Sequence, residues 1–209
     1  KHEFENPQFD MPSLERECEQ SFGFPVFVKP ASAGSSVGVT KVTVKDRLYD
    51  ALETAFLYDR LVMIEPGIEG KEVECSVIGN DEITSFKPGE IVPSHDFYSY
   101  DAKYLDPEGA LLRVPADISE EETVQVRELA EKAYRAAAIE GMARVDFFVE
   151  NKTGRILLNE VNTIPGFTDI SMFSRMCDES GLAYGKLIDE IIDLGLKRFE
   201  EKQELKYER

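Results

Sequence analysis

The chain has 209 residues, 42% of them hydrophobic, and no apolar run approaches the about 18 residues that indicate a membrane span. Its formal net charge of −17 would repel nucleic acid and anionic membranes over most of the surface, so we expect neither as a partner. This charge does not exclude a nucleotide, because a small anion responds to the few lysines and arginines near it.

The three cysteines, Cys18, Cys75 and Cys177, are scattered and show no paired spacing. An odd number of cysteines without a disulfide pattern is typical of a reducing compartment, and we expect a cytoplasmic protein. Two histidines leave a zinc site without ligands. The chain begins at Lys1, in what reads as a loop, which favours a fragment whose N-terminal portion is missing.

A lysine stands between an apolar strand and a loop of small residues early in the chain. Residues 12–23 predict a short helix, 24–29 a buried strand that ends in Lys29, and 39–44 a second strand. The loop 31–38 between the strands contains only small residues. An ammonium before several backbone N–H groups suits phosphate, although a flexible hairpin linker would have the same composition. Because the lysine precedes the loop, this is not a Walker loop.

Two glutamates follow at a turn between predicted strands. Residues 45–58 have the apolar spacing of a helix. Three strands are predicted after this helix, over 61–67, 72–79 and 82–92. Glu65 and Glu72 bracket the turn between the first two of them. Carboxylates at a hinge between subdomains are suited to the adenine amine and ribose hydroxyls of a nucleotide, and surface glutamates are the alternative.

Residues 95–109 form a polar loop with three tyrosines, too long for a simple connection. Loops of this length are usually lids or disordered, and the tyrosines argue against disorder. A long helix is predicted to begin after Ser119, which caps it ahead of an acidic first turn. Two further helices finish the chain, the last from about Tyr184 to Phe199.

The stretch 144–162 predicts a hairpin between that long helix and the two final ones. Two apolar strands join through a three-residue loop, 152–154, with glycine at its last position, as a bulged hairpin turn requires. We expect Asn151 to face Arg155 across this loop. That pairing would fix the register of the whole hairpin.

The predicted register brings four polar side chains onto one face, because strand residues alternate with a period of two. Asp146 is expected opposite Glu160, and Arg144 opposite Asn162. Two carboxylates and an amide oxygen at this spacing favour a hard cation such as Mg²⁺, with phosphate on its open positions and Arg144 nearby to meet negative charge. A surface hairpin whose polar face meets water is the alternative. The Pro-Gly turn in 163–168 favours a site, since backbone there can approach a ligand closely.

Several of these segments together resemble the D-alanine:D-alanine ligases of the ATP-grasp superfamily. In chain order they are FPVFVKP at 24–30, GSSVG at 34–38, YDAKY at 100–104, RVD at 144–146 and NEVNTIPGFT at 159–168. The resemblance covers nearly the whole chain. It implies an α+β protein with the ATP-grasp fold, in which a small subdomain, 1–62, and a large one, 63–209, grip ATP between antiparallel sheets. The large subdomain would carry the long active-site loop at about 94–109.

The resemblance also implies roles for individual residues toward ATP and metal. Lys29 and Lys103 would meet the phosphates, Glu65 the adenine amine and Glu72 the ribose. Further nucleotide contacts are implied for Ser35, Ser36, Pro66, Ile68, Phe148, Asn159 and Glu160. Family members often carry a lysine at the position of Pro66, and because this chain has proline there, only a backbone contact is expected. Two Mg²⁺ ions, replaceable by Mn²⁺, would be held by Asp146, Glu160 and Asn162.

The implied reaction joins two D-alanines into a peptidoglycan precursor. The first D-alanine carboxylate attacks the γ-phosphate of ATP, and the amine of the second displaces phosphate from the resulting acyl phosphate. Arg144 and the backbone N–H of Gly166 would stabilise the tetrahedral oxyanion. Ser171 and Met172 match the positions that meet the acceptor carboxylate.

In this resemblance, Ser35 closes over the site toward Tyr104. Ligases that use D-lactate or D-serine as acceptor are the alternative, but they depart from YDAKY and tend to carry arginine in place of Met172. A nucleotide-binding module without activity is the other alternative, because the family's preceding domain, which engages the first D-alanine, has no counterpart here. We therefore expect the fragment alone to be inactive and the full-length protein to form a homodimer.

Overall fold

A computed structural model of the chain describes three stretches, residues 1–93, 110–168 and 171–205. The predicted long loop, with Lys103 and Tyr104, lies outside the described residues. Among the described helices, none combines the length and apolarity needed to span a bilayer. All three cysteines are buried and free, and burial raises the pKa of the Cys75 and Cys177 thiols to about 12.

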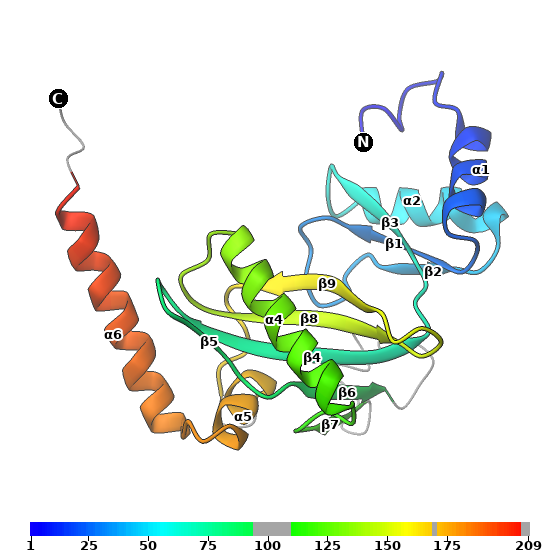
Figure 1. Ribbon diagram of the computed structural model, residues 1–209. Coiled ribbons are helices and arrows are strands. Elements are labelled where there is room, and N and C mark those ends of the chain that lie inside the picture. Colours follow the sequence, from blue (N-terminus) through cyan, green and yellow to red (C-terminus); the bar gives the residue numbers. More distant parts are fainter. Residues whose placement is uncertain (94–109, 169–170, 206–209) are drawn as a thin grey trace. The chain divides into compact units, whose positions relative to one another are not determined.

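The chain divides into two compact units, each built on its own antiparallel sheet (Figure 1). The first unit runs from Lys1 to Ile68, and the second contains Glu69–Pro93 and the described residues from Leu111 onward. The expected boundary after residue 62 falls inside a strand of the first unit. This strand pairs with the first unit's sheet as far as Pro66, and the segment of the first unit ends at Ile68.

In its described residues, the first unit contains a three-stranded sheet, two α-helices and a short 3-10 helix. Its elements are α1 (Met11–Ser21), β1 (Val26–Pro30), β2 (Thr40–Val42), η1 (Lys45–Arg47), α2 (Leu48–Phe56) and β3 (Val62–Pro66). The sheet order is β2-β1-β3. Every second residue of β1, beginning with Val26, is buried against α1 and α2. The alternate residues, Phe27 and Lys29, therefore lie on the other face of the sheet.

The second unit is larger and contains the predicted hairpin. Its strands are β4 (Gly70–Gly79), β5 (Ile83–Ser85), β6 (Gly89–Pro93), β7 (Ala110–Arg113), β8 (Gly141–Glu150) and β9 (Ile156–Asn162). The sheet order is β7-β6-β4-β8-β9, and β5 pairs with β4 beside this path. The single strand predicted over 82–92 is wrong, because the chain turns at Phe86–Pro88 and forms two strands. Proline lacks the N–H that a continuous strand would need.

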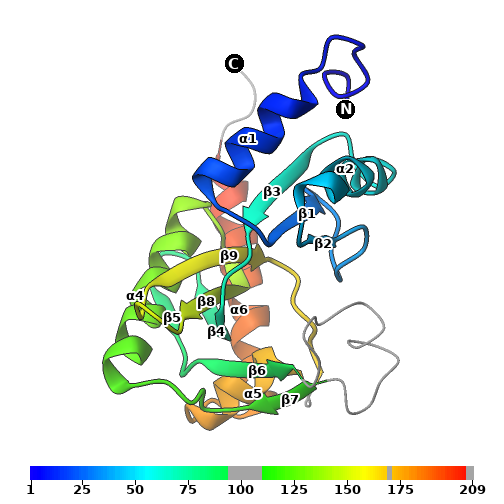
Figure 2. The same ribbon diagram turned by 90° about the vertical axis from the view of Figure 1, so that its right-hand side faces the viewer.

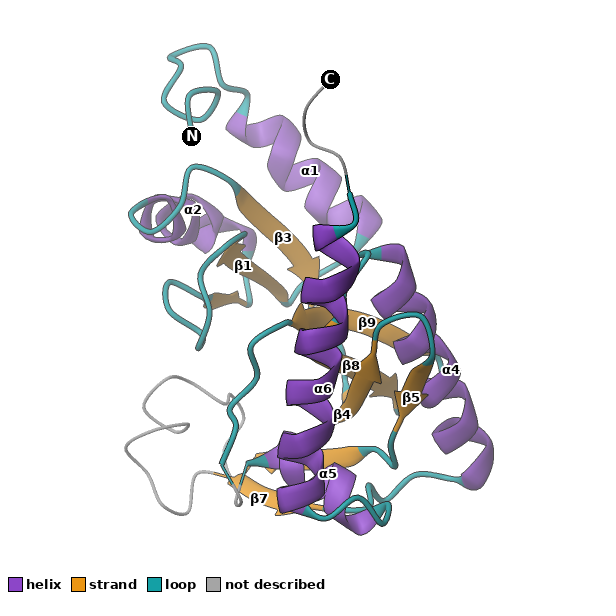
Figure 3. Ribbon diagram, turned by 90° about the vertical axis from the view of Figure 1, so that its left-hand side faces the viewer, coloured by secondary structure: helices purple, strands orange, loops and turns teal. Residues whose placement is uncertain are grey.

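Helices cover both faces of the second sheet (Figures 2 and 3). They are α4 (Glu120–Ala136), α5 (Met172–Glu179) and α6 (Tyr184–Gln203). One face of β4 and β8 packs on α4, where Tyr134 is fully buried and donates a hydrogen bond to the Gly79 carbonyl oxygen at 2.8 Å. The opposite face packs on α5 and the first turns of α6, but only at the end of the strands near Ile78 and Met142. The rest of that face carries the polar residues described below.

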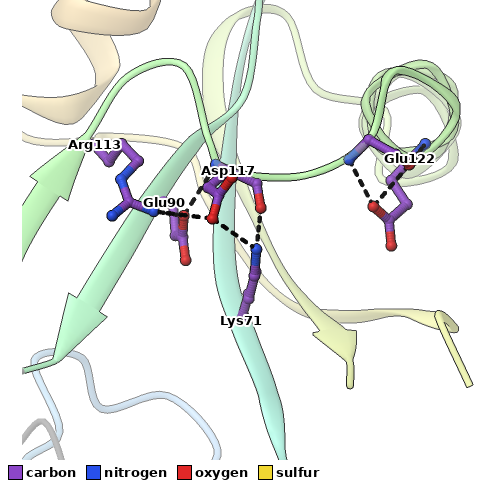
Figure 4. A network of polar contacts seen from close by, with 6 residues as sticks. Lys71, Glu90, Arg113, Asp117 and Glu122 are labelled. Atoms are coloured by element: carbon purple, nitrogen blue, oxygen red, sulfur yellow. Dashed lines mark hydrogen bonds and ion pairs between the residues drawn. The ribbon is translucent and has the colours of Figure 1, made fainter. Parts of the chain in front are cut away.

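The start of α4 is tied to β4, β6 and β7 by a network of charged groups (Figure 4). Ser119 and Glu122 form the predicted capping box. On β6, the buried Glu90 carboxylate accepts hydrogen bonds from Arg113 Nη1 at 3.1 Å and from the Asp117 backbone N–H at 3.0 Å. Lys71 of β4 completes the network on Asp117. Glu90 is thus a buried carboxylate that pairs with a partly exposed arginine, away from the predicted site.

Candidate functional site

The hairpin register at the predicted metal residues is confirmed. Asp146 lies opposite Glu160, and Arg144 lies opposite Asn162. The expected pairing at the turn is wrong, because Glu150 rather than Asn151 bonds to Arg155, and the loop has four residues. A β-bulge between Asp146 and Phe147 adds one residue to β9 and restores the expected register beyond it.

Three carboxylates form a row across adjacent strands of the second unit. Glu74 of β4 lies opposite Asp146 of β8, which lies opposite Glu160 of β9. Glu74 and Asp146 are 4% and 8% exposed, whereas Glu160 is exposed. The next row along the same face contains Arg144 and Asn162. Buried carboxylates require compensating charge, and Arg144 supplies it.

The Arg144 guanidinium binds Asp146 with two hydrogen bonds. Its Nε donates to Oδ1 at 2.8 Å and its Nη2 donates to Oδ2 at 2.7 Å, while Nε also lies 3.2 Å from Glu74 Oε2 as an ion pair. Burial acts to lower the pKa of Arg144, but the hydrogen bonds and charge of Asp146, together with the charges of Glu74 and Glu160, outweigh it and raise the pKa above its usual value. Arg144 therefore stays charged at any physiological pH.

The Asn162 amide connects the two predicted metal-binding carboxylates. Its Nδ2 donates to Asp146 Oδ2 at 2.9 Å and to Glu160 Oε1 at 3.1 Å. A hydrogen-bond donor thus lies between two carboxylate oxygens, the position that suits a cation. A half-turn of the amide would place Oδ1 there instead. In the described part of the chain, no three His, Cys, Asp or Glu side chains converge on a metal site, so the oxygen donors that fit a hard cation here are two carboxylates and one amide.

In the first unit, two predicted nucleotide residues contact each other. Lys29 Nζ lies 2.7 Å from Glu65 Oε2, on the sheet face opposite the helices. The register explains this pair, because Glu65 faces Phe27 and Lys29 is the next residue of β1 on the same face. The Lys29 side chain is only 15% exposed, so its ammonium is held close to the sheet.

The small-residue loop after Lys29 contains a turn with unusual backbone angles. Ser35 and Ser36 have positive φ angles of 56° and 59°, a conformation that costs non-glycine residues about 1–3 kcal/mol and clusters at functional sites. Gly38 also has a positive φ, and a Cβ there would lie 2.5 Å from the Tyr58 ring. The loop is therefore fixed against the first unit.

The remaining predicted nucleotide residues lie at the junction after β3 and on the polar face of the second sheet. Pro66 ends β3, and Ile68 ends the segment Lys1–Ile68 of the first unit. Glu72 lies opposite Phe148 in the β4–β8 pairing, two residues from Glu74 and on the same face. Asn159 is the residue that the bulge inserts into β9.

The predicted acceptor residues meet at the start of α5. Ser171 is the N-cap residue of α5, and its Oγ accepts a hydrogen bond from the Thr168 backbone N–H at 3.1 Å. A Cβ built on Gly166 would lie 3.3 Å from the same oxygen, so the two residues are close neighbours. Met172 begins α5 and is buried. Sequence reasoning missed Glu74, although its alternation with Glu72 on one strand was the signal that places both on one face.

Named proteins are similar in sequence to nearly the whole of this chain. A D-alanine--D-alanine ligase of Treponema denticola is 47% identical over 206 residues, 99% of this chain and 56% of the relative. One from Thermoanaerobacter sp. is 49% identical over 193 residues, 92% of this chain and 54% of the relative. The chain thus spans about half the length of the curated relatives it matches.

Solved structures of such ligases share the fold. The D-alanine-D-alanine ligase from Coxiella burnetii superposes with a TM-score of 0.80 at 35% identity, covering 94% of this chain and 52% of that one. The VanG D-Ala:D-Ser ligase from Enterococcus faecalis does so with a TM-score of 0.79 at 38% identity, covering 90% and 54%. The expected α+β, ATP-grasp fold is confirmed. Because residues 3–193 match the family described as D-ala D-ala ligase C-terminus, the chain belongs to that family.

Proposed function

We propose that this chain is the ATP-binding and acceptor-binding part of a ligase that joins two D-alanines for peptidoglycan synthesis. The observation that carries the proposal is the polar row on β4, β8 and β9, where Arg144, Asp146, Glu160 and Asn162 meet on one face. Carboxylates that can bind a cation, placed beside a fixed guanidinium, suit an enzyme that transfers a phosphoryl group and then lets an amine attack the acyl group. The relatives from Treponema denticola and Thermoanaerobacter sp. catalyse this kind of ligation by name.

The nucleotide-binding groups in this proposal come from both units. In the first unit, Lys29 binds phosphate together with backbone N–H groups of Ser35 and Ser36, and Glu65 accepts the adenine amine beside the Pro66 and Ile68 backbone. In the second unit, Glu72 binds ribose, with Phe148, Asn159 and Glu160 around the nucleotide. The positive φ angles of the loop and the mostly covered Lys29 side chain support this assignment. The first unit is then the small ATP-grasp subdomain and the second the large one.

Asp146, Glu160 and Asn162 are the residues that would hold Mg²⁺, for which Mn²⁺ is a substitute. When bound, two such ions would neutralise charge on the transferring phosphate. The oxygen donors converge without a cation because the Asn162 amide donates between the carboxylates. These residues therefore need a half-turn of one amide rather than a rearrangement of the strands.

Arg144 and the Gly166 N–H are placed by this proposal on the oxyanion that forms when an amine attacks the acyl phosphate. Ser171 and Met172 bind the acceptor carboxylate, and the N-terminus of α5 favours negative charge there. D-alanine is the proposed acceptor, since the relatives that are 47% and 49% identical to this chain over the matched residues are D-alanine--D-alanine ligases by name. Free buried thiols support a cytoplasmic location, and we keep a homodimer as the proposed state of the full-length protein.

ATP titrated into the chain with Mg²⁺ should bind at least about tenfold, roughly 1.4 kcal/mol, more tightly than GTP. The reason is that Glu65 can accept a hydrogen bond from the 6-amino group of adenine, which guanine lacks. Calorimetry of wild type and Glu65→Gln checks this, with Glu53→Gln on the exposed surface of α2 as the control. Equal affinities of the wild type for ATP and GTP would remove Glu65 from the nucleotide site, and absence of binding would overturn the proposed function.

A further inference from the structure

Glu74 is a buried carboxylate that the proposed chemistry does not yet use. It lies on β4, next to β8, and only 5% of its side chain is exposed. It pairs with Arg144, whose Nε lies 3.2 Å from Glu74 Oε2. A buried charge of this kind is costly unless it has a partner. Arg144 is such a partner, and a role for Glu74 is therefore sought in its contact with Arg144.

The order of the strands separates Glu74 from the predicted cation position. The sheet runs β4-β8-β9, so Glu74 and Glu160 lie on opposite sides of Asp146. The Asn162 amide, which marks the cation position, contacts Asp146 and Glu160. Asp146 would therefore contact two positive groups, the guanidinium of Arg144 and the metal ion beside Glu160.

Arg144 already bonds to both oxygens of Asp146, so a metal ion on Asp146 would compete with the guanidinium for the same carboxylate charge. A divalent ion on Asp146 would weaken those bonds and would also repel the guanidinium. Arg144 then needs a second anion that does not bind the ion. Glu74 is such an anion, since it is already in contact with Nε.

Resting on the proposed function, we infer that Glu74 is a positioning residue for Arg144. It holds the guanidinium in place when a cation draws Asp146 away, so that Arg144 stays beside the reacting phosphate and acyl groups. Glu74 thus allows Asp146 to serve as a metal ligand without the loss of the Arg144 geometry. Outer partners of this kind typically change metal affinity or activity by about 10–100-fold when they are removed.

The chain offers a matched control for this inference. Glu90 is also a buried carboxylate in the second unit, 5% exposed, and it pairs with Arg113 at 3.1 Å (Figure 4). Glu74→Gln and Glu90→Gln therefore each remove one negative charge from a buried glutamate that pairs with an arginine. Only the first lies beside the row that is proposed to bind a cation.

The first measurement is a Mg²⁺ titration of ATP binding to wild-type chain, Glu74→Gln, Glu74→Asp and Glu90→Gln. Glu74→Gln should need about tenfold more Mg²⁺ for the same ATP affinity, the lower end of the range for outer partners. Glu74→Asp, which keeps the charge, should recover part of this loss. Glu90→Gln should match the wild type even if both Gln variants lose stability.

The second measurement reads Arg144 directly, through the Nε–H resonance in ¹H–¹⁵N spectra, assigned by its absence in Arg144→Met. With Mg²⁺ and ATP bound, that proton should stay protected from exchange in wild type and become unprotected in Glu74→Gln. If Glu74→Gln matches Glu90→Gln in both measurements while the wild type requires Mg²⁺, the inference is wrong and the proposed function stands. If the wild type binds no nucleotide, the proposed function fails and the inference fails with it.

Discussion

Replacing Asp146 by Asn and Glu160 by Gln together is expected to remove the magnesium dependence of ATP binding. In wild type, Mg²⁺ should tighten ATP binding by at least about tenfold, roughly 1.4 kcal/mol, because two carboxylates on adjacent strands attract a hard cation that also binds phosphate. In the double variant, calorimetry with Mg²⁺ and with EDTA should give the same affinity. The two substitutions keep the shape of each side chain and remove only charge.

The control for this experiment must change net charge equally, because a chain with a net charge of −17 repels ATP as a whole. Glu128→Gln with Asp178→Asn removes two exposed carboxylates of the second unit outside the row. This control should retain the response to Mg²⁺. A double variant of Asp146 and Glu160 that still requires Mg²⁺ would show that the cation binds elsewhere.

Arg144→Met is expected to lower the free energy of unfolding of the second unit by about 3 kcal/mol, the lower end of the cost of breaking a buried ion pair. The variant keeps most of the side-chain volume but leaves Glu74 and Asp146 buried beside each other without the guanidinium that both contact. Because the chain has two units, unfolding should be followed by hydrogen exchange of the β8 amides.

Arg113→Met tests whether this loss is specific to the row. Arg113 also pairs with a buried glutamate, but its side chain is 41% exposed against 23% for Arg144, so water can solvate what it leaves behind. Its loss should be clearly smaller. Equal stabilities of Arg144→Met and wild type would mean that groups other than Arg144 compensate the negative charges of Glu74 and Asp146.

The sequence predicted the hairpin of β8 and β9 and the pairing of its polar residues, because strand periodicity and a glycine turn are local properties. Asp146 and Glu160 are opposite each other as expected, although the pairing near the turn differs from the expected one. The loop is one residue longer than expected, and the bulge at Asn159 restores the register. A bulge changes the pairing without changing the apolar pattern on either side, so the pattern could not reveal it.

The role of β4 could not be read from the sequence in the same way. Glu72 and Glu74 alternate with buried residues, but only the sheet order places Glu74 beside Asp146. Partners from distant segments depend on which strands become neighbours, and that choice is made by packing of the whole unit. The contact between Lys29 and Glu65 has the same origin, since it follows from the pairing of β1 with β3.

The measurement that tests the central claim most directly is formation of the D-alanyl-D-alanine dipeptide. The matched relatives are about twice as long, so the chain should be joined behind the preceding part of the Treponema denticola ligase and assayed with ATP, Mg²⁺ and D-alanine, D-serine or D-lactate. The account predicts D-alanine-dependent phosphate release and the dipeptide from the joined protein. It also predicts release at least about a hundredfold slower from the 209 residues alone, because an unpositioned first D-alanine loses the advantage of proximity. A joined protein that binds Mg²⁺ and ATP but makes no dipeptide, or that prefers D-serine or D-lactate, would contradict it.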